Sequence, residues 1–351
     1  MLLSLFEYLS QFNSGFNVFQ YLTLRIVMGA LTSLIITLIL GPYIISYLKN
    51  KQFYQSIRTD GPKSHIDDKN STPTMGGIII ISSVLISSIL WADLKNNYII
   101  ILLFGIFSFG LIGFYDDYKK LMKKNSDGIK GRVKLFLQII FASLITLYLF
   151  FYMETGQLAS VVPFLKDNSL YFGFFFIPWS IFILVGSSNA VNLTDGLDGL
   201  AILPCILIAS AFVIFSYVHG NVNISNYLLI PYIENSGEIA IFAASLVGAG
   251  LGFLWFNSYP AEIFMGDCGS LSLGCSLGLL AIILKQELAF AIMSGIFIAE
   301  VVSVVLQVSS YKLRKGKRIF KMAPLHHHYE LSGLSEPKII MRFWIITFIL
   351  V

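Results

Sequence analysis

The sequence predicts an all-α, polytopic integral membrane protein, and three observations support that class. The chain of 351 residues is 56% hydrophobic and only 13% charged, and its mean hydropathy is +0.76. A soluble domain of this size has roughly twice that charged fraction. Apolar stretches close to the roughly 20 residues that cross a bilayer recur along the whole chain. We therefore expect a single transmembrane domain over residues 1–351.

About ten membrane-spanning helices account for the apolar stretches. Each stretch consists mainly of aliphatic and aromatic residues and is bounded by polar or charged residues. The expected spans cover residues 20–48, 75–92, 98–115, 133–152, 171–189, 200–219, 238–256, 270–285, 289–311 and 338–351. In the seventh span, the small residues of Gly248-Ala-Gly-Leu-Gly252 predict close packing against another helix.

The loops between these spans fall into two sets on opposite sides of the membrane. One set comprises residues 49–74, 116–132, 190–199, 257–269 and 312–337. It holds most of the lysines and arginines of the chain, whereas the other set contains only Lys95 and Lys166, with Arg25 and Lys285 near its boundary. Because basic loops stay in the cytoplasm, we expect the first set there and both termini on the extracytoplasmic side.

Two adjacent carboxylates, Asp116 and Asp117, follow the third apolar run in Gly-Phe-Tyr-Asp-Asp-Tyr-Lys-Lys. Carboxylates at the rim of a span cost free energy unless a cation uses them. One interpretation is a solvated helix end, with the following lysines among lipid headgroups. The other is functional: like charges raise the pKa of one carboxylate, so that one aspartate accepts a proton while the other binds a cation. The pair alone does not choose between the two.

A polar run, Asn189-Ala-Val-Asn-Leu-Thr-Asp-Gly-Leu-Asp-Gly-Leu-Ala, follows the fifth span. Its polar residues Asn189, Asn192, Asp195 and Asp198 recur every three positions, so consecutive members are neighbours on a helical turn. A 3₁₀ turn would align all four, whereas an α-helix would rotate them around its axis. A capping turn is one interpretation. Amide and carboxylate groups without a lysine also suit hydrogen bonding to a nucleobase or sugar.

A second polar segment, Pro260-Ala-Glu-Ile-Phe-Met-Gly-Asp-Cys-Gly-Ser-Leu, joins the seventh and eighth spans just after Asn257. Asp267 stands between two glycines, and an exposed carboxylate on such tight backbone suits a Mg²⁺ site that retains several waters. The Phe264 ring offers a surface on which a base can stack. The alternative is a short connection in which Asp and Ser cap a helix.

Three of the five histidines lie together in Pro324-Leu-His-His-His-Tyr-Glu, before the last span. Adjacent histidines rarely all reach one ion and no second ligand set has metal spacing, which argues against zinc. Because these side chains are partly cationic near neutral pH, we expect them to contact phosphate. Upstream, Lys69 precedes the second span, where Thr72 and Pro73 equally suit the start of a helix.

Five motifs together resemble one family. They are Thr-Pro-Thr-Met-Gly-Gly at 72–77, Gly-Phe-Tyr-Asp-Asp at 113–117, Asn-Leu-Thr-Asp-Gly-Leu-Asp-Gly at 192–199, Phe-Met-Gly-Asp-x-Gly-Ser-Leu at 264–271 and Pro-Leu-His-His-His-Tyr-Glu at 324–330. In order and spacing they are similar to the motifs of the phospho-N-acetylmuramoyl-pentapeptide transferase (MraY) family, which belongs to the polyprenyl-phosphate sugar-1-phosphate transferases. The resemblance covers nearly the whole chain.

This resemblance implies a Mg²⁺-dependent transmembrane catalytic domain of ten spans, usually a homodimer, in the bacterial cytoplasmic (inner) membrane with its active site facing the cytoplasm. The implied reaction transfers phospho-N-acetylmuramoyl-pentapeptide from UDP-N-acetylmuramoyl-pentapeptide to the membrane lipid undecaprenyl phosphate, giving lipid I and UMP. That reaction is the first membrane step of peptidoglycan synthesis. It involves no nucleic acid.

The resemblance also implies roles for individual residues. Asp267 matches the Mg²⁺ ligand, Asp116 matches the aspartate proposed to deprotonate the lipid phosphate, and Asp117 matches its neighbour; with His326 they form the expected catalytic set. The residues expected on the nucleoside side are Asn192, Asp195, Asp198 and Phe264. The residues expected near the phosphates are Lys69, Lys120, Lys134, Asn257, His327 and His328.

Two other functions stay open at this point. One is a relative in the same superfamily that uses UDP-N-acetylglucosamine, although relatives with that donor have a different histidine pattern. The other is a secondary transporter or lipid flippase, in which ionisable groups lie near the bilayer midplane between related halves. The acidic clusters of this chain lie at span ends and no halves repeat, which favours the transferase.

Overall fold

The computed structural model describes residues 1–53, 72–123, 128–153, 158–162, 169–314 and 316–351. Its helices, in chain order, are α1 (Leu2–Ser10), η1 (Ser14–Gln20), α2 (Leu22–Asn50), α4 (Gly77–Trp91), α5 (Asn97–Lys123), α6 (Gly131–Tyr152), η3 (Gly173–Phe175), α7 (Phe176–Thr194), α8 (Ile202–His219), α9 (Val222–Leu228), η4 (Ser236–Glu238), α10 (Ile239–Asn257), α11 (Gly266–Ile283), α12 (Glu287–Met293), α13 (Gly295–Leu313), α14 (Leu325–Glu330) and α15 (Glu336–Leu350). A small hairpin pairs β1 (Ala159–Val161) antiparallel with β2 (Ser169–Tyr171).

The predicted all-α polytopic class is confirmed. Eight of the described helices are long and apolar enough to cross a membrane, namely α2, α5, α6, α7 with η3, α8, α10 with η4, α11 and α13. Helix α4 is apolar but has 15 residues, or about 22 Å at 1.5 Å per residue, which is less than the roughly 30 Å of bilayer hydrocarbon. Helix α15 also has 15 residues. Each predicted span thus has a helix, while the count of ten spans and the side of the termini stay predictions.

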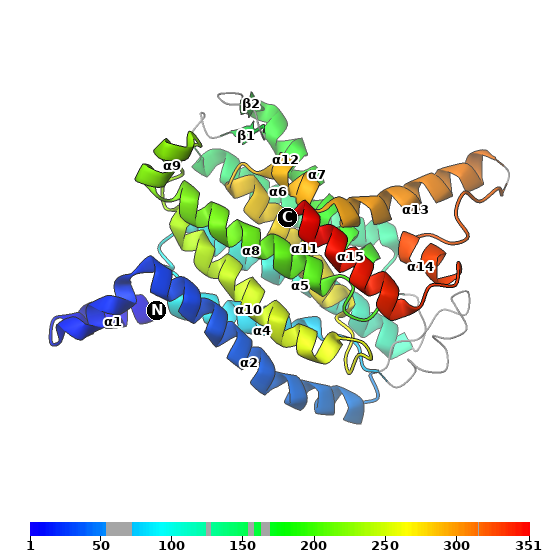
Figure 1. The fold of residues 1–351 in the computed structure, drawn as a ribbon, viewed down its shortest axis with the longest axis horizontal. Coiled ribbons are helices and arrows are strands. Elements are labelled where there is room, and N and C mark those ends of the chain that lie inside the picture. Colours follow the sequence, from blue (N-terminus) through cyan, green and yellow to red (C-terminus); the bar gives the residue numbers. More distant parts are fainter. Residues whose placement is uncertain (54–71, 124–127, 154–157, 163–168, 315) are drawn as a thin grey trace.

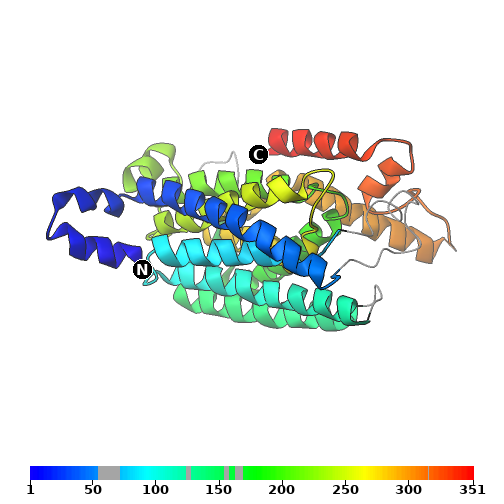
Figure 2. The same cartoon turned by 90° about the horizontal axis from the view of Figure 1, so that it is seen from below.

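Helices α10 and α11 form the centre of the bundle. Helix α10 packs against α2, α4 and α8, and α11 packs against α5 and α7. Every residue of α11 from Cys268 to Ile283 is buried. The spanning helices lie side by side along the long axis of the molecule, α13 extends beyond their body towards α14, and α1 with η1 projects at the opposite end (Figures 1 and 2).

Small residues allow the central helices to approach closely. A side chain at Gly274 of α11 would overlap the backbone of Ser187 and Ser188 in α7. In the same way, a side chain at Gly248 of α10 would overlap the backbone of Ala30 in α2, which confirms the predicted packing role of this glycine. Lipid provides little hydrophobic driving force between helices, so such van der Waals contacts contribute most of the attraction between them.

Helix α5 is longer than the predicted third span. That span was expected to end at residue 115, but the helix continues to Lys123. Asp116 and Asp117 therefore lie inside a helix, and both are only 3% exposed. The interpretation of the pair as a solvated helix end is wrong. Hydropathy marks where apolar side chains stop, whereas the backbone hydrogen bonds of α5 continue for two more turns.

An ion pair stabilises the end of the bundle that lies opposite Asp116 and Asp117. The Nη1 and Nη2 atoms of Arg25 in α2 donate to the two carboxylate oxygens of Glu238, at 2.8 and 2.5 Å. The backbone N–H of Asp93 donates to the same carboxylate at 3.0 Å. A bidentate pair of this kind is stronger and more directional than a single hydrogen bond. It ties α2 to η4 and to the connection between α4 and α5.

We predict that Gly113→Ala destabilises the protein. The added methyl group would overlap the backbone of Asp267 and Cys268, and overpacking of this kind typically costs about 1–3 kcal/mol. The measurement is the thermal unfolding temperature in detergent. Gly186→Ala is the matched control, because Gly186 lies within α7 with open space around it and alanine favours a helix by about 1 kcal/mol. Equal stability of the two variants would contradict the close approach of α5 and α11.

Candidate active site

Five charged side chains meet at one end of the bundle, and we call them the charge cluster. Asp116, Asp117 and Lys120 come from one face of α5, because residues three and four positions apart are neighbours on a helix. Lys134 comes from α6 and Asp267 from the first turn of α11. Three carboxylates and two ammonium groups are thus collected from three helices.

Distances within the charge cluster are short. Lys120 Nζ lies 2.9 Å from Asp116 Oδ2, 3.6 Å from Asp117 Oδ1 and 2.9 Å from Asp267 Oδ2. Lys134 Nζ lies 2.6 Å from Asp267 Oδ2 and 3.6 Å from Asp116 Oδ2. Removing one partner of a buried ion pair leaves an uncompensated charge and costs roughly 3–5 kcal/mol. The five groups therefore hold one another in place.

Asp117 caps the start of α11. Its Oδ2 accepts a hydrogen bond from the backbone N–H of Cys268 at 3.1 Å, and the backbone N–H of Asp267 also bonds to it. The first N–H groups of a helix have no partner within the helix, and a carboxylate satisfies them and complements the positive helix end. Gly266 has a φ of 73°, and any side chain there would overlap the Asp117 carboxylate. Glycine at this position lets Asp117 reach the helix and fix Asp267.

Asn192 positions the other oxygen of Asp267. Its Nδ2 donates to Asp267 Oδ1 at 2.7 Å and to Ser270 Oγ at 2.8 Å. Asn192 is expected on the nucleoside side, and the structure places it directly beside the expected metal ligand. The sequence did not single out Ser270 for this site, although its position three residues after Asp267 puts both on one face of α11.

The Thr-Pro-Thr-Met-Gly-Gly motif pairs with the loop that leads into α11. The N–H of Phe264 donates to Pro73 O at 2.8 Å, and the N–H groups of Gly76 and Gly77 donate to the carbonyls of Phe264 and Met265, both at 2.9 Å. The backbone pairing leaves the Phe264 side chain half-buried. These bonds fix the start of α4 against the start of α11. Lys69 lies outside the described residues, so its role stays a prediction.

Two expected substrate-binding residues hold loops of the protein itself. Asp198 Oδ2 accepts a hydrogen bond from the N–H of Ala261 at 3.0 Å. Asn257 accepts from the N–H of Gly199 at 3.2 Å and donates to Ile263 O at 2.8 Å. Asp198 and Asn257 are both buried. Their side chains therefore shape the connection between α10 and α11, and their contact with a substrate stays a prediction.

Asp195 lies at the end of α7, between the charge cluster and the loop after α10. Its carboxylate accepts a hydrogen bond from the backbone N–H of Gly266. Burial, followed by the negative charges of Asp267 and Asp117, raises the pKa of Asp195 to about 8. The residue is mostly buried, with part of its surface exposed. Asp195 thus offers a carboxyl group that can donate or accept a hydrogen bond near neutral pH.

His326 is buried where α14 meets α13. Leu325 N donates to Glu300 Oε2 at 2.6 Å, and His326 N and Nδ1 both lie 3.2 Å from Glu300 Oε1. Burial lowers the pKa of His326, although the Glu300 carboxylate opposes the shift, and this direction favours the neutral ring; the expected contact of this histidine with phosphate stays a prediction. Glu300 was missed in the sequence, although a single carboxylate within the apolar run 295–308 is a functional signal in a membrane protein.

The other two histidines of the run have different partners. His327 Nδ1 lies 2.7 Å from Glu330 Oε2 within α14, and His328 Nδ1 accepts a hydrogen bond from the N–H of Lys321 at 3.2 Å. A Cβ added at Gly196 would overlap the His326 ring. The polar run after α7 and the histidine run are therefore packed against each other.

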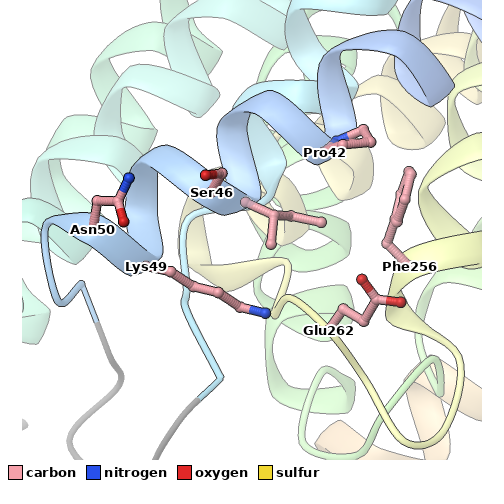
Figure 3. A pocket seen from close by; sticks show the side chains of 7 residues that line it. Pro42, Ser46, Lys49, Asn50, Phe256 and Glu262 are labelled. Carbon is pink, nitrogen blue, oxygen red and sulfur yellow. The ribbon is translucent and has the colours of Figure 1, made fainter.

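A hollow of about 330 Å³ opens beside the charge cluster, between α2 and the end of α10 (Figure 3). Its lining residues are Pro42, Ile45, Ser46, Lys49, Asn50, Phe256 and Glu262. Figure 3 shows Lys49 extending across the hollow towards the loop that carries Glu262. The lining includes no member of the charge cluster. The hollow is thus a separate feature at the same end of the bundle.

Among the described residues, no group of three or more His, Cys, Asp or Glu side chains is arranged to hold a metal ion. Asp267 is the most accessible carboxylate of the charge cluster, with 14% of its side chain exposed against 4% for Asp116 and Asp117. Its oxygens are of the hard type that Mg²⁺ prefers, and Mg²⁺ is commonly held by one or two carboxylates together with substrate phosphates. Asp267 therefore fits the expected metal ligand.

Two protein-family descriptions match the chain. The family described as glycosyl transferase family 4 matches residues 99–285, which are more than half of the chain and include all five residues of the charge cluster. The description phospho-N-acetylmuramoyl-pentapeptide-transferase signature 1 matches residues 69–81, at the start of α4. The chain therefore belongs to glycosyl transferase family 4, and within the polyprenyl-phosphate sugar-1-phosphate transferases it is of the phospho-N-acetylmuramoyl-pentapeptide transferase (MraY) type.

Proposed function

We propose that the chain transfers phospho-N-acetylmuramoyl-pentapeptide from UDP-N-acetylmuramoyl-pentapeptide to undecaprenyl phosphate, forming lipid I and UMP. Transfer of the phosphosugar-pentapeptide to a lipid carrier follows from the family signature. The observation that carries the finer proposal is the charge cluster, in which two lysines share the Asp267 carboxylate at one end of a membrane bundle. A site at a bundle end suits one substrate held in lipid and another in water.

Both substrates are anionic, and the reaction must bring their phosphates together. Catalysis of phosphoryl transfer rests mainly on positioning and on electrostatic stabilisation of the charge that moves. The side chains of Lys120 and Lys134 are 28% and 15% exposed, so their ammonium groups are accessible to a phosphate. We assign to them the binding of the diphosphate of the nucleotide substrate.

The charge balance of the cluster favours a bound cation. With all five groups ionised, three carboxylates and two ammonium groups leave one negative charge, which would repel an anionic substrate. Asp267 is the residue that would hold Mg²⁺. When bound, the ion offsets phosphate charge and stabilises the charge that develops during transfer. Asn192 donates to the Asp267 carboxylate, and Asp117 accepts from the Asp267 backbone N–H, so the two residues fix Asp267 through its side chain and its backbone.

The contacts of the two adjacent aspartates favour different roles. Asp116 contacts Lys120 and Lys134 through Oδ2 and accepts a hydrogen bond from Ile129 N at 2.5 Å through Oδ1. Asp117 is occupied as the cap of α11. We assign Asp116 as the base that takes the proton of the lipid phosphate, and Asp117 as a positioning residue. The proposal includes a single-domain homodimer in the bacterial cytoplasmic membrane, with this end facing the cytoplasm.

The direct test is turnover by the purified chain in detergent with Mg²⁺, UDP-N-acetylmuramoyl-pentapeptide and undecaprenyl phosphate. We expect equal amounts of UMP and of the lipid-linked product. UDP-N-acetylglucosamine supplied as the only donor should give neither product. Turnover with that donor alone would favour the other branch of the superfamily. Transport of the lipid in liposomes without UMP release would reject the transferase.

We predict that Asp267→Asn lowers kcat by at least about 10²–10³-fold, the effect of removing one group that stabilises a transition state. Excess Mg²⁺ should not restore activity, because a neutral amide is a weak ligand for the ion. Asp93→Asn is the matched control, since Asp93 lies at the opposite end of the bundle and its side chain accepts a hydrogen bond from the nearby N–H of Lys95. Near-normal activity of Asp267→Asn would remove it as the metal ligand.

We predict that Asp116→Asn removes the rise of the rate with pH. A general base works only when it is deprotonated, so the rate of the wild type should climb with pH until Asp116 is ionised. Without the base, the rate should not change with pH and should lie about 10²–10⁴-fold below the plateau of the wild type. The measurement is the pH dependence of kcat.

Asp117→Asn separates the two aspartates. This variant should lower the unfolding temperature, because it weakens the cap of α11, yet retain the rise of the rate with pH. A flat profile for Asp117→Asn and a normal rise for Asp116→Asn would exchange the two assignments.

A further inference from the structure

Glu300 is a fully buried carboxylate in the membrane-spanning helix α13. A buried carboxylate without partners costs several kcal/mol, so its partners indicate why it is there. Among the described residues, the groups within hydrogen-bonding distance of this carboxylate come from one short segment: the N–H of Leu325, the N–H of His326 and Nδ1 of His326. An ionised carboxylate only accepts hydrogen bonds and suits this arrangement. Glu300 therefore holds the start of α14 and the ring of His326 together.

The contact with Glu300 determines which ring nitrogen of His326 carries the proton. A carboxylate accepts only, so Nδ1 must be the protonated nitrogen. Burial lowers the pKa of His326, which favours the neutral ring. In a neutral ring with the proton on Nδ1, Nε2 has a free lone pair and acts as an acceptor. The other charged or titratable groups near this ring are His327 and Glu330.

The Nε2 atom of His326 is fully buried and has no hydrogen-bond partner among the described residues. It points at Gly196, where an added Cβ would overlap the ring. Gly196 belongs to the polar run that also carries Asn192, the partner of Asp267. A buried acceptor left without a partner costs roughly 1–3 kcal/mol. An arrangement that retains this cost, beside the polar run that carries Asn192, points to a ligand that completes it.

We propose that Glu300 is a positioning residue, which holds His326 in the tautomer that presents Nε2 as a hydrogen-bond acceptor to the nucleotide substrate. The inference rests on the proposed function and assigns a partner class to this histidine. Because Nε2 carries a lone pair, its partner is an N–H or O–H group, such as a hydroxyl or imide of the nucleotide substrate. An ionised phosphate oxygen, which has no proton, would be repelled.

The tautomer is measured directly in the wild-type protein by NMR of ¹⁵N-labelled histidine, which distinguishes protonated from unprotonated ring nitrogens. We expect the ring signals that are lost in His326→Asn to show Nδ1 protonated and Nε2 unprotonated near neutral pH. His219 is also buried and has the same expected tautomer, because Nδ1 faces Pro231 O and Nε2 faces Gln286 Nε2, and its signals remain in that variant. A His326 ring with a proton on Nε2 would overturn the proposal. This measurement needs no substrate, so its outcome is independent of the proposed reaction.

Glu300→Gln tests the positioning. A glutamine places an N–H group at one of the two carboxylate positions; where this group faces His326, Nδ1 becomes the acceptor and the proton moves to Nε2. We expect this change of tautomer, together with a fall of about 10–100-fold in kcat/KM, the range seen for the outer partners of histidines at metal sites. The KM for the lipid should not change. A Glu300→Gln protein in which the tautomer changes but kcat/KM does not, or in which kcat/KM falls while the tautomer is unchanged, would overturn the proposal.

Two controls separate positioning from a general loss of stability. Glu330→Gln should alter the signals of His327 and leave the tautomer of His326 unchanged, because Glu330 contacts the neighbouring ring. Glu238→Gln removes the negative charge of the Arg25–Glu238 ion pair at the opposite end of the bundle and should lower the unfolding temperature without changing kcat/KM of the folded enzyme.

A double variant tests whether Glu300 acts through His326. His326→Asn keeps a donor near the position of Nδ1 and removes Nε2, so adding Glu300→Gln should reduce kcat/KM little further. If the reduction of kcat/KM in the double variant equals the product of the reductions in the two single variants, Glu300 acts independently of the histidine. If the wild type itself fails to release UMP, the proposed function fails, while the tautomer result still stands or falls by itself.

Discussion

The contact between Asp267 and two lysines is the constraint on which this end of the protein depends. Neither sign of charge is stable there alone, because a buried ion without its partner costs several kcal/mol. The first turn of α11 must therefore lie against α5 and α6, and the glycines at the contact follow from that requirement. Gly113 leaves room for the backbone of Asp267, and Gly266 leaves room for Asp117 to cap the helix. Charge pairing, helix capping and close packing thus all depend on the position of the first turn of α11 against α5 and α6.

The polar run that forms the end of α7 and the turn after it connects the charged and the uncharged parts of the site. Asn192 contacts Asp267, Gly196 lies against His326, and Gly199 N donates to Asn257. Three contacts to three different segments leave this run little freedom to move independently. A substrate that touches one part of the run is therefore held in register with both the lysines and the neutral histidine.

Much of this arrangement was predictable from the sequence, because hydropathy locates spans and the motifs carry the three aspartates of the charge cluster. The rest depends on tertiary contacts that local patterns do not encode. The end of α5 was misplaced, since apolar side chains stop before the helix does. Asn257 has the groups of a ligand-binding residue, yet its neighbours in the fold use both ends of its amide. The role of Glu300 becomes clear only from its contact with His326, which lies 26 positions later in the chain.

The same reasoning about partners explains why a neutral histidine suits this position better than a charged one. The lysines already supply the positive charge that a diphosphate needs, and they are partly accessible. A cationic His326 would add a second attractive point for phosphate, so the substrate could bind in a displaced register. A neutral acceptor does not compete for phosphate and forms a favourable hydrogen bond only with a ligand that brings an N–H or O–H to it. Burying His326 against Glu300 therefore separates the recognition of charge from the recognition of uncharged polar groups.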